Sequence, residues 1–156
     1  LRRIREAVPG VTAVCKAGRH AHYNIFIAMK KMSEGDPGRA AAAALTELHA
    51  KHIFVFDDDI DVYNPTEILW AVATRVQPHR QVSVMQPTFT GNYLDPTVVD
   101  ETKTSVMIVD ATRPLDRPFS PVSKVPDEAM ARIKVDDYIP GEVLQHIPVD
   151  RTTYWS

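Results

Sequence analysis

One segment, residues 53–75, constrains the fold and the function more than any other part of the chain. It reads IFVFDDDIDVYNPTEILWAVATR, which is a short apolar run, a cluster of aspartates and then a helical pattern. An apolar run followed at once by helix-start signals predicts a buried strand that leads into a helix. Ligand sites of α/β proteins tend to form where such strands end. The acidic cluster therefore indicates a metal site, a charge network or a structural turn.

Four aspartates make up this cluster: Asp57, Asp58, Asp59 and Asp61. Adjacent carboxylates repel one another, so they require a cation, an arginine partner or water. One interpretation is a divalent metal held by oxygen ligands. The other is a strand-to-helix turn in which one aspartate accepts backbone N–H groups and another pairs with Arg75 or Arg80. We favour the turn, because aspartates satisfy turn backbones well.

Strand and helix patterns alternate along the first three quarters of the chain. Short apolar runs predict strands at residues 11–15, 23–29, 53–56, 82–85 and 106–109. Asp36 followed by Pro37, and Asn64 followed by Pro65, are typical helix starts. In the second helix, Ile68, Leu69, Val72 and Val76 form one predicted apolar stripe. The alternation predicts an α/β fold, with helices packed against a mixed sheet.

Prolines separate a domain from a tail. We expect residues 1–114 to form the α/β domain, whereas residues 115–156 are interrupted repeatedly by proline. Such a Pro-rich tail predicts packing on the domain or on a neighbouring subunit rather than a core of its own. Because residue 1 is Leu and already lies in a helical pattern, we also expect the chain to be a piece of a longer protein or a processed product.

The composition argues against several classes of protein. The formal net charge is -2 and there is no Lys/Arg run, which argues against a nucleic-acid surface. A single cysteine, Cys15, rules out an internal disulfide and predicts a reducing, cytoplasmic location. No apolar run approaches the roughly 18 residues of a membrane span, so no membrane contact is expected.

Two loops are further candidates for a binding site. The turn at residues 16–20 contains Lys16, Arg19 and His20, which could face an anionic ligand or simply form an exposed basic hairpin. The segment 86–103 is long for a loop inside a compact domain, and such loops are often functional. Its aromatic residues, Phe89 and Tyr93, suit an apolar ligand, but they could equally pin the loop to its own domain.

Three stretches together resemble one family. They are HAKHIFVFDDDIDVYNPTEILWAVATRVQP at 49–78, LDPT at 94–97 and KTSVMIVDATRP at 103–114. This order resembles the C-terminal domain of UbiD-type decarboxylases, and the resemblance covers about residues 9–114. It implies a lyase that removes or adds CO2 at a small aromatic, heteroaromatic or α,β-unsaturated acid.

The resemblance also implies cofactors and a division of labour. Family members use prenylated FMN, with a divalent metal, usually Mn2+, and K+ at the cofactor phosphate. The catalytic residues and metal ligands of the family lie in the N-terminal flavin-binding region, so we expect no catalytic residue and no metal ligand here, and no activity from this chain alone. The domain is expected to close over the flavin of that region, in the same or a separate chain, and to support a homo-oligomer.

By the same resemblance, two groups of residues receive roles. The substrate-pocket wall is expected to comprise Lys16, Gly18, Arg19, His20, Thr88, Phe89 and Tyr93. The structural charge network is expected to comprise Asp58, Asp59, Asp61 and Arg75. Members that act on cinnamate-like acids carry an aromatic residue in the first turn, where this chain has Gly18 and Arg19. A roomier or more polar acid is therefore expected.

Two alternatives stay open at this point. The run Asp57-Asp58-Asp59 after an apolar strand also fits a glycosyltransferase-like domain, which would bind a metal and a nucleotide sugar. The chain could also be a stand-alone, non-catalytic assembly module for a separate flavin-bearing chain.

Overall fold

The computed structural model describes residues 2–17, 23–47, 50–90, 95–97, 103–121, 123, 125–134 and 137–144. The chain divides into two compact units, Leu1–Pro118 and Phe119–Ser156. In the second unit, the described residues contain two short α-helices, α5 (Asp127–Met130) and α6 (Gly141–Leu144). Among the described helices, none combines the length and apolar character that crossing a membrane requires. That the tail packs on the domain or on a neighbouring subunit stays a prediction.

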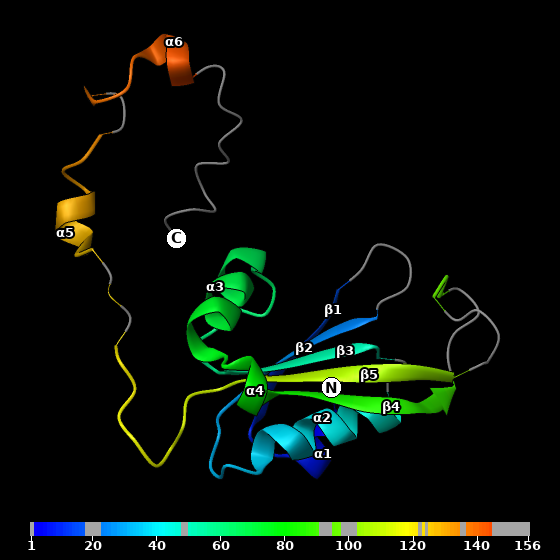
Figure 1. Ribbon diagram of the computed structural model, residues 1–156. Helices are drawn as coiled ribbons and strands as arrows, with labels where there is room; N and C mark the ends of the chain where they lie inside the picture. The colour runs from blue at the N-terminus through cyan, green and yellow to red at the C-terminus, as the bar shows by residue number, and fades with distance from the viewer. Residues whose placement is uncertain are drawn as a thin grey trace. The chain divides into compact units, whose positions relative to one another are not determined.

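The first unit is built on a five-stranded mixed sheet (Figure 1). Its strands are β1 (Val11–Ala17), β2 (Asn24–Met29), β3 (His52–Asp57), β4 (Val82–Thr90) and β5 (Lys103–Ala111). They lie in the order β1-β2-β3-β5-β4. The three inner strands are parallel, and each edge strand is antiparallel to its neighbour. The predicted mixed α/β sheet is confirmed.

β4 is longer than the sequence indicated. The strand was expected to end at residue 85, but it continues to Thr90 with an irregularity between Met85 and Phe89. Pro87 lies inside this interval and has no N–H to donate to the ladder. A proline is tolerated there because β4 is an edge strand. Pro87 and its neighbours therefore read as a loop in the sequence although they extend the sheet.

Helices cover the two faces of the sheet (Figure 1). α1 (Arg2–Ala7) and α2 (Asp36–Glu47) lie on one face, and α3 (Pro65–Arg75) lies on the other. A further short helix, α4 (Pro78–Gln81), precedes β4. The first face buries Ile25, Ile27, Ile53 and Val55 against the alanines of α2. Because alanine side chains are short, α2 can lie close to the sheet.

The start of α3 follows the expected local chemistry. Asn64 is the N-cap, its side-chain oxygen accepts the Thr66 N–H at 3.0 Å, and Pro65 occupies the first turn. Glu67 accepts the backbone N–H of Asp61 at 2.8 Å and so ties the helix to the preceding turn. The predicted apolar stripe was wrong at Leu69, which is 69% exposed. Leu69 follows the buried Ile68 directly, and successive helical residues point about 100° apart.

Candidate functional site

The parallel strands sort the polar residues into two groups. β2, β3 and β5 end at Met29, Asp57 and Ala111, and we call this edge the aspartate end. The opposite end of the strands contains the last residues of β1 and β4 and the first residues of β2, β3 and β5. We call it the loop end. β3 alone has six residues, so the two ends are separated by roughly 20 Å along the strands.

Arg75 organises the aspartate end. Its side chain is only 1% exposed, although it carries a full charge. Two parallel hydrogen bonds of 2.9 Å run from its Nη1 and Nη2 to the two carboxylate oxygens of Asp59. Nη1 also donates to Oδ2 of Asp57 at 3.0 Å. This bidentate geometry is the strongest form of arginine–carboxylate pairing.

A second arginine completes the network from the neighbouring strand. Arg113 follows β5, which pairs with β3, and its backbone N–H donates to Oδ2 of Asp57 at 2.8 Å. Its Nε donates to the same oxygen at 3.1 Å, and its Nη1 lies 3.4 Å from Oδ2 of Asp59. The network therefore joins the end of β3, the end of β5 and the end of α3.

Electrostatics at this end match a structural role. Hydrogen bonds from Arg75 hold the pKa of Asp59 below its usual range, with a further contribution from the charge of Arg113. No group of three or more His, Cys, Asp and Glu side chains in the described part of the chain could hold a metal ion. Because Asp57 and Asp59 bind arginines, the glycosyltransferase alternative finds no support in this geometry.

Asp58 and Asp61 lie in different surroundings from the arginine network. Asp58 is exposed at the turn. Asp61 is also exposed, and its carboxylate accepts the Tyr63 N–H at 2.9 Å, which stabilises the turn before α3. Sequence reasoning omitted Asp57 and Arg113 from the charge network. Both could have been suspected, because each follows or ends an apolar run and parallel neighbours bring such ends together.

The loop end is held by a different ion pair. Lys51 lies just before β3, and its Nζ donates to Oδ2 of Asp95 at 2.8 Å. Asp95 is buried, and its other oxygen accepts the backbone N–H and the hydroxyl of Thr97 at 3.0 and 2.7 Å. The Lys51 ammonium, with these bonds, lowers the pKa of Asp95 to about 2. Sequence reasoning missed this pair.

Three polar side chains lie beside this ion pair. The Nδ1 of His52 lies 2.8 Å from the side-chain oxygen of Asn24 on the adjacent strand. Burial, and then the charge of Lys51, lower the pKa of His52, which favours a neutral imidazole. The hydroxyl of Tyr23 is buried and has no hydrogen-bond partner among the described residues. Burial raises the pKa of Tyr23, and the charge of Asp95 raises it further.

The structure describes only part of the predicted substrate-pocket wall. Lys16 is exposed near the end of β1. Thr88 and Phe89 lie in β4, with their side chains outside the described set, and Phe89 pairs with Thr104. Gly18, Arg19, His20 and Tyr93 lie outside the described residues. The strand ends that lead into both predicted loops, Ala17 of β1 and Thr90 of β4, lie at the loop end.

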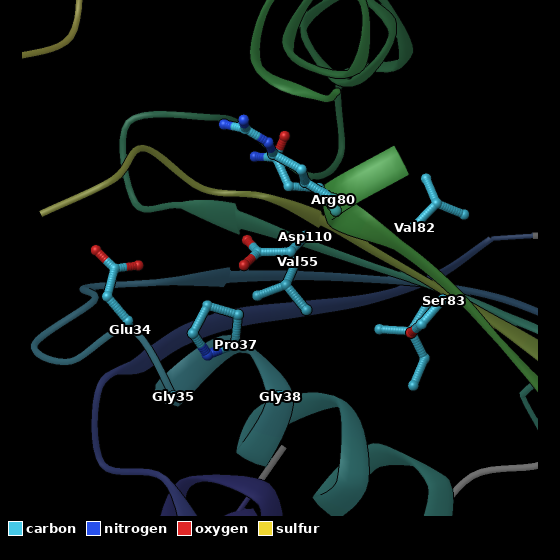
Figure 2. Close-up of a pocket in the computed structure, with 11 residues that line it drawn as sticks. Glu34, Gly35, Pro37, Gly38, Val55, Arg80, Val82, Ser83 and Asp110 are labelled. Carbon is cyan, nitrogen blue, oxygen red and sulfur yellow. The ribbon is translucent and has the colours of Figure 1, made fainter. Parts of the chain in front are cut away.

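A pocket of about 260 Å³ lies at the aspartate end, on the α2 face of the sheet (Figure 2). Its wall combines the start of α2, at Pro37 and Gly38, with Val55 of β3, Ser83 of β4 and Asp110 of β5. Oδ1 of Asp110 already accepts the N–H and the hydroxyl of Thr112. Glu34, also in the wall, pairs with Lys31 and accepts the Leu115 N–H at 2.6 Å. These carboxylates have structural partners, so they do not mark a ligand site.

Known proteins match this fold and these motifs. Residues 1–111 match the family model described as the 3-octaprenyl-4-hydroxybenzoate carboxy-lyase C-terminal domain. The chain is 38% identical over 116 residues to an anhydromevalonate phosphate decarboxylase of Aeropyrum pernix, covering 72% of this chain and 26% of that protein. It thus spans about a quarter of the length of that relative.

Solved structures agree with the sequence match. The UbiD-class enzyme HmfF from Pelotomaculum thermopropionicum, in complex with FMN, matches with a TM-score of 0.73 and 35% identity. That match covers 88% of this chain and 31% of the HmfF chain. An evolved dimeric form of HmfF, in complex with prFMN, matches with a TM-score of 0.65 and 31% identity, covering 88% of this chain and 28% of that one. The chain therefore belongs to the UbiD family of carboxy-lyases and carries its C-terminal domain.

Proposed function

We propose that this chain acts as the C-terminal domain of a prenylated-FMN-dependent decarboxylase or carboxylase. The observation that carries the proposal is the match over residues 1–111, together with 35% identity to a solved UbiD-class enzyme that holds FMN. The substrate would be a small aromatic, heteroaromatic or α,β-unsaturated carboxylic acid. A homo-oligomer and a cytoplasmic location remain predictions.

In this proposal the chain supplies walls and support rather than the reacting groups. The flavin, with Mn2+ and K+ at its phosphate, would supply the bond-breaking chemistry. The described residues do not fit such a metal site, because they contain no group of three His, Cys, Asp and Glu side chains that could hold a metal ion. From the family resemblance, we assign the cofactor to the N-terminal flavin-binding region, in the same chain or a separate one.

The substrate side of the domain would be the loop end. Both strands that lead into the predicted wall reach this edge, and Lys16 is exposed there. An exposed ammonium is suited to an acid that carries a second anionic or polar group. The relative from Aeropyrum pernix is named for such a compound, a phosphorylated acid. This agrees with the expectation of a roomy or polar acid.

Native mass spectrometry of the protein from its source tests the proposal. We expect an assembly that contains a flavin-sized ligand together with a longer chain or a partner chain. A bare 17.5 kDa species, or an oligomer of it without flavin, would instead identify a stand-alone assembly module.

A substrate panel would then refine the proposal. CO2 release would be measured with cinnamate, 4-hydroxybenzoate and anhydromevalonate phosphate. We expect that cinnamate is not the best substrate of the three. If cinnamate is the best substrate, the expectation of a roomier or more polar acid is wrong.

A further inference from the structure

The Lys51–Asp95 ion pair connects a fixed point in the sheet with the β4–β5 connection. The backbone of Lys51 is held on two sides, because its N–H donates to the Tyr23 carbonyl at 2.9 Å and its carbonyl accepts the Met107 N–H at 2.9 Å. Lys51 thus lies at the start of β3, between the residue that precedes β2 and the middle of β5. Because its backbone is held by these two hydrogen bonds, the side chain of Lys51 starts from a fixed position.

The partner of Lys51 is Asp95, which is fixed in place by burial and hydrogen bonds. It lies between β4 and β5, 44 residues from Lys51 in sequence, and it is buried. Asp, Pro and Thr at positions 95–97 favour a tight turn, in which Asp95 accepts the Thr97 N–H. One carboxylate oxygen closes this turn and the other binds Lys51. Both oxygens of the buried carboxylate are therefore used to fix the turn against the sheet.

β4 needs such an anchor at its far end. It is an edge strand, so only β5 pairs with it. Its pairing is irregular between Met85 and Phe89, and it resumes at Phe89↔Thr104 and Thr90↔Lys103. An interrupted edge strand with two resumed pairs opens easily unless something outside the ladder restrains it.

We propose that Lys51 and Asp95 are positioning residues that fix the turn at residues 95–97, between β4 and β5, against the start of β3. In doing so they set the place of Thr88 and Phe89, which the proposed function puts in the substrate-pocket wall. The inference deepens that proposed function and rests on it. It assigns Lys51 no contact with substrate, since its Nζ is engaged by Asp95.

Amide hydrogen exchange of the intact protein tests the anchor itself. In Lys51→Met we expect exchange at residues 88–90 and 95–97 to rise by at least about tenfold, while exchange at Val55, toward the aspartate end of β3, stays unchanged. Lys51→Arg should restore protection, because an arginine can also donate to Asp95. Arg39→Met is the matched control, since it removes an exposed guanidinium that pairs with Asp36 on α2, and it should leave the loop end unchanged.

Kinetics of the whole enzyme test the consequence for substrate. We expect Lys51→Met to raise KM on the order of tenfold with a smaller change in kcat, and Lys51→Arg to restore KM. Exchange that rises uniformly over the sheet, or does not rise at all, would overturn the inference. So would a local rise in exchange with an unchanged KM.

Two further results keep the test decisive. If Lys51→Met does not fold, the double variant Lys51→Met with Asp95→Asn removes both charges and is held to the same expected results. If the wild-type enzyme releases no CO2 from any acid of the panel, the proposed function fails. The exchange data would still show whether the ion pair fixes residues 88–90 and 95–97.

Discussion

The two ends of the sheet use charge in different ways. At the aspartate end, Arg75 and Arg113 bind Asp57 and Asp59 in a network that joins two strands and a helix. At the loop end, within the part of the chain that the structure describes, the Lys51–Asp95 ion pair connects the sheet to the turn at residues 95–97. The densest cluster of acids in the sequence therefore holds the fold together, and it is at the other end that we propose a ligand binds. A cluster of charges is not by itself a sign of a site.

Removal of Arg75 should have the largest effect. Arg75→Ala leaves Asp57 buried with fewer partners and is expected to lower the free energy of unfolding by about 3 kcal/mol. Urea unfolding followed by circular dichroism measures it. Arg80→Ala is the control, because Arg80 is exposed in the separate short helix α4 and should change stability by less than about 0.5 kcal/mol. Equal losses in the two variants would contradict the network.

Substitutions of Asp57 and of Asp58 should differ clearly in their effect on stability. Asp57→Asn removes a charge that is hydrogen-bonded to two arginines. It should lower the free energy of unfolding by about 2 kcal/mol. Asp58→Asn changes an exposed side chain next to it and should cost less than about 0.5 kcal/mol. The same urea titration compares them. A metal site made of Asp57, Asp58 and Asp59 would predict instead that both variants lose Mn2+ binding.

The stability that the Lys51–Asp95 ion pair contributes should decrease at low pH. The pKa of Asp95 is about 2 in the fold, below the ordinary value near 3.9, so the pair stabilises the protein above about pH 4. That stability is lost as the pH falls from about 4 to about 2. In Lys51→Met the pKa of Asp95 should shift up toward its ordinary value, so less stability should be lost as the pH falls from about 4 to about 2. Urea midpoints between pH 2 and 6 would show this shift, and a profile parallel to that of the wild type would argue against the ion pair.

The smallest effect is expected at the outer edge of the network. The guanidinium of Arg75 lies 5.3 Å from the ring centroid of Trp70, which is 38% exposed. Trp70→Leu keeps much of the apolar contact but loses the cation–π interaction. It should lower the free energy of unfolding by about 0.5–1 kcal/mol. Trp70→Phe retains an aromatic face and should cost less. If thermal melting ranks phenylalanine below leucine, the cation–π contribution is negligible.

Local patterns predicted much of this fold. The alternation of apolar runs and helix starts gave the α/β class and the approximate place of each inner strand, and the Asn64-Pro65 start of α3 was read correctly. These features depend on neighbouring residues. Leu69 and the second half of β4 were misjudged, because a stripe of similar residues does not fix helix rotation and Pro87 resembles a loop signal.

The site was less predictable because its contacts cross the sheet. Arg113 reaches Asp57 over 56 residues and Lys51 reaches Asp95 over 44. Nothing within one sequence window indicates which of several adjacent aspartates turns inward. Asp57 is the last residue of β3 and lies at the buried end of that strand, whereas Asp58 lies in the turn and faces solvent.

One measurement tests the contrast between the ends most directly. Hydrogen exchange of the whole enzyme would be compared with and without a bound acid that it decarboxylates. We expect new protection at the loop end, at residues 16–17, 88–90 and 95–97, and none at the aspartate end around residues 57–61 and 113. Protection confined to the aspartate end would contradict this expectation, because it would place the ligand beside the arginine network.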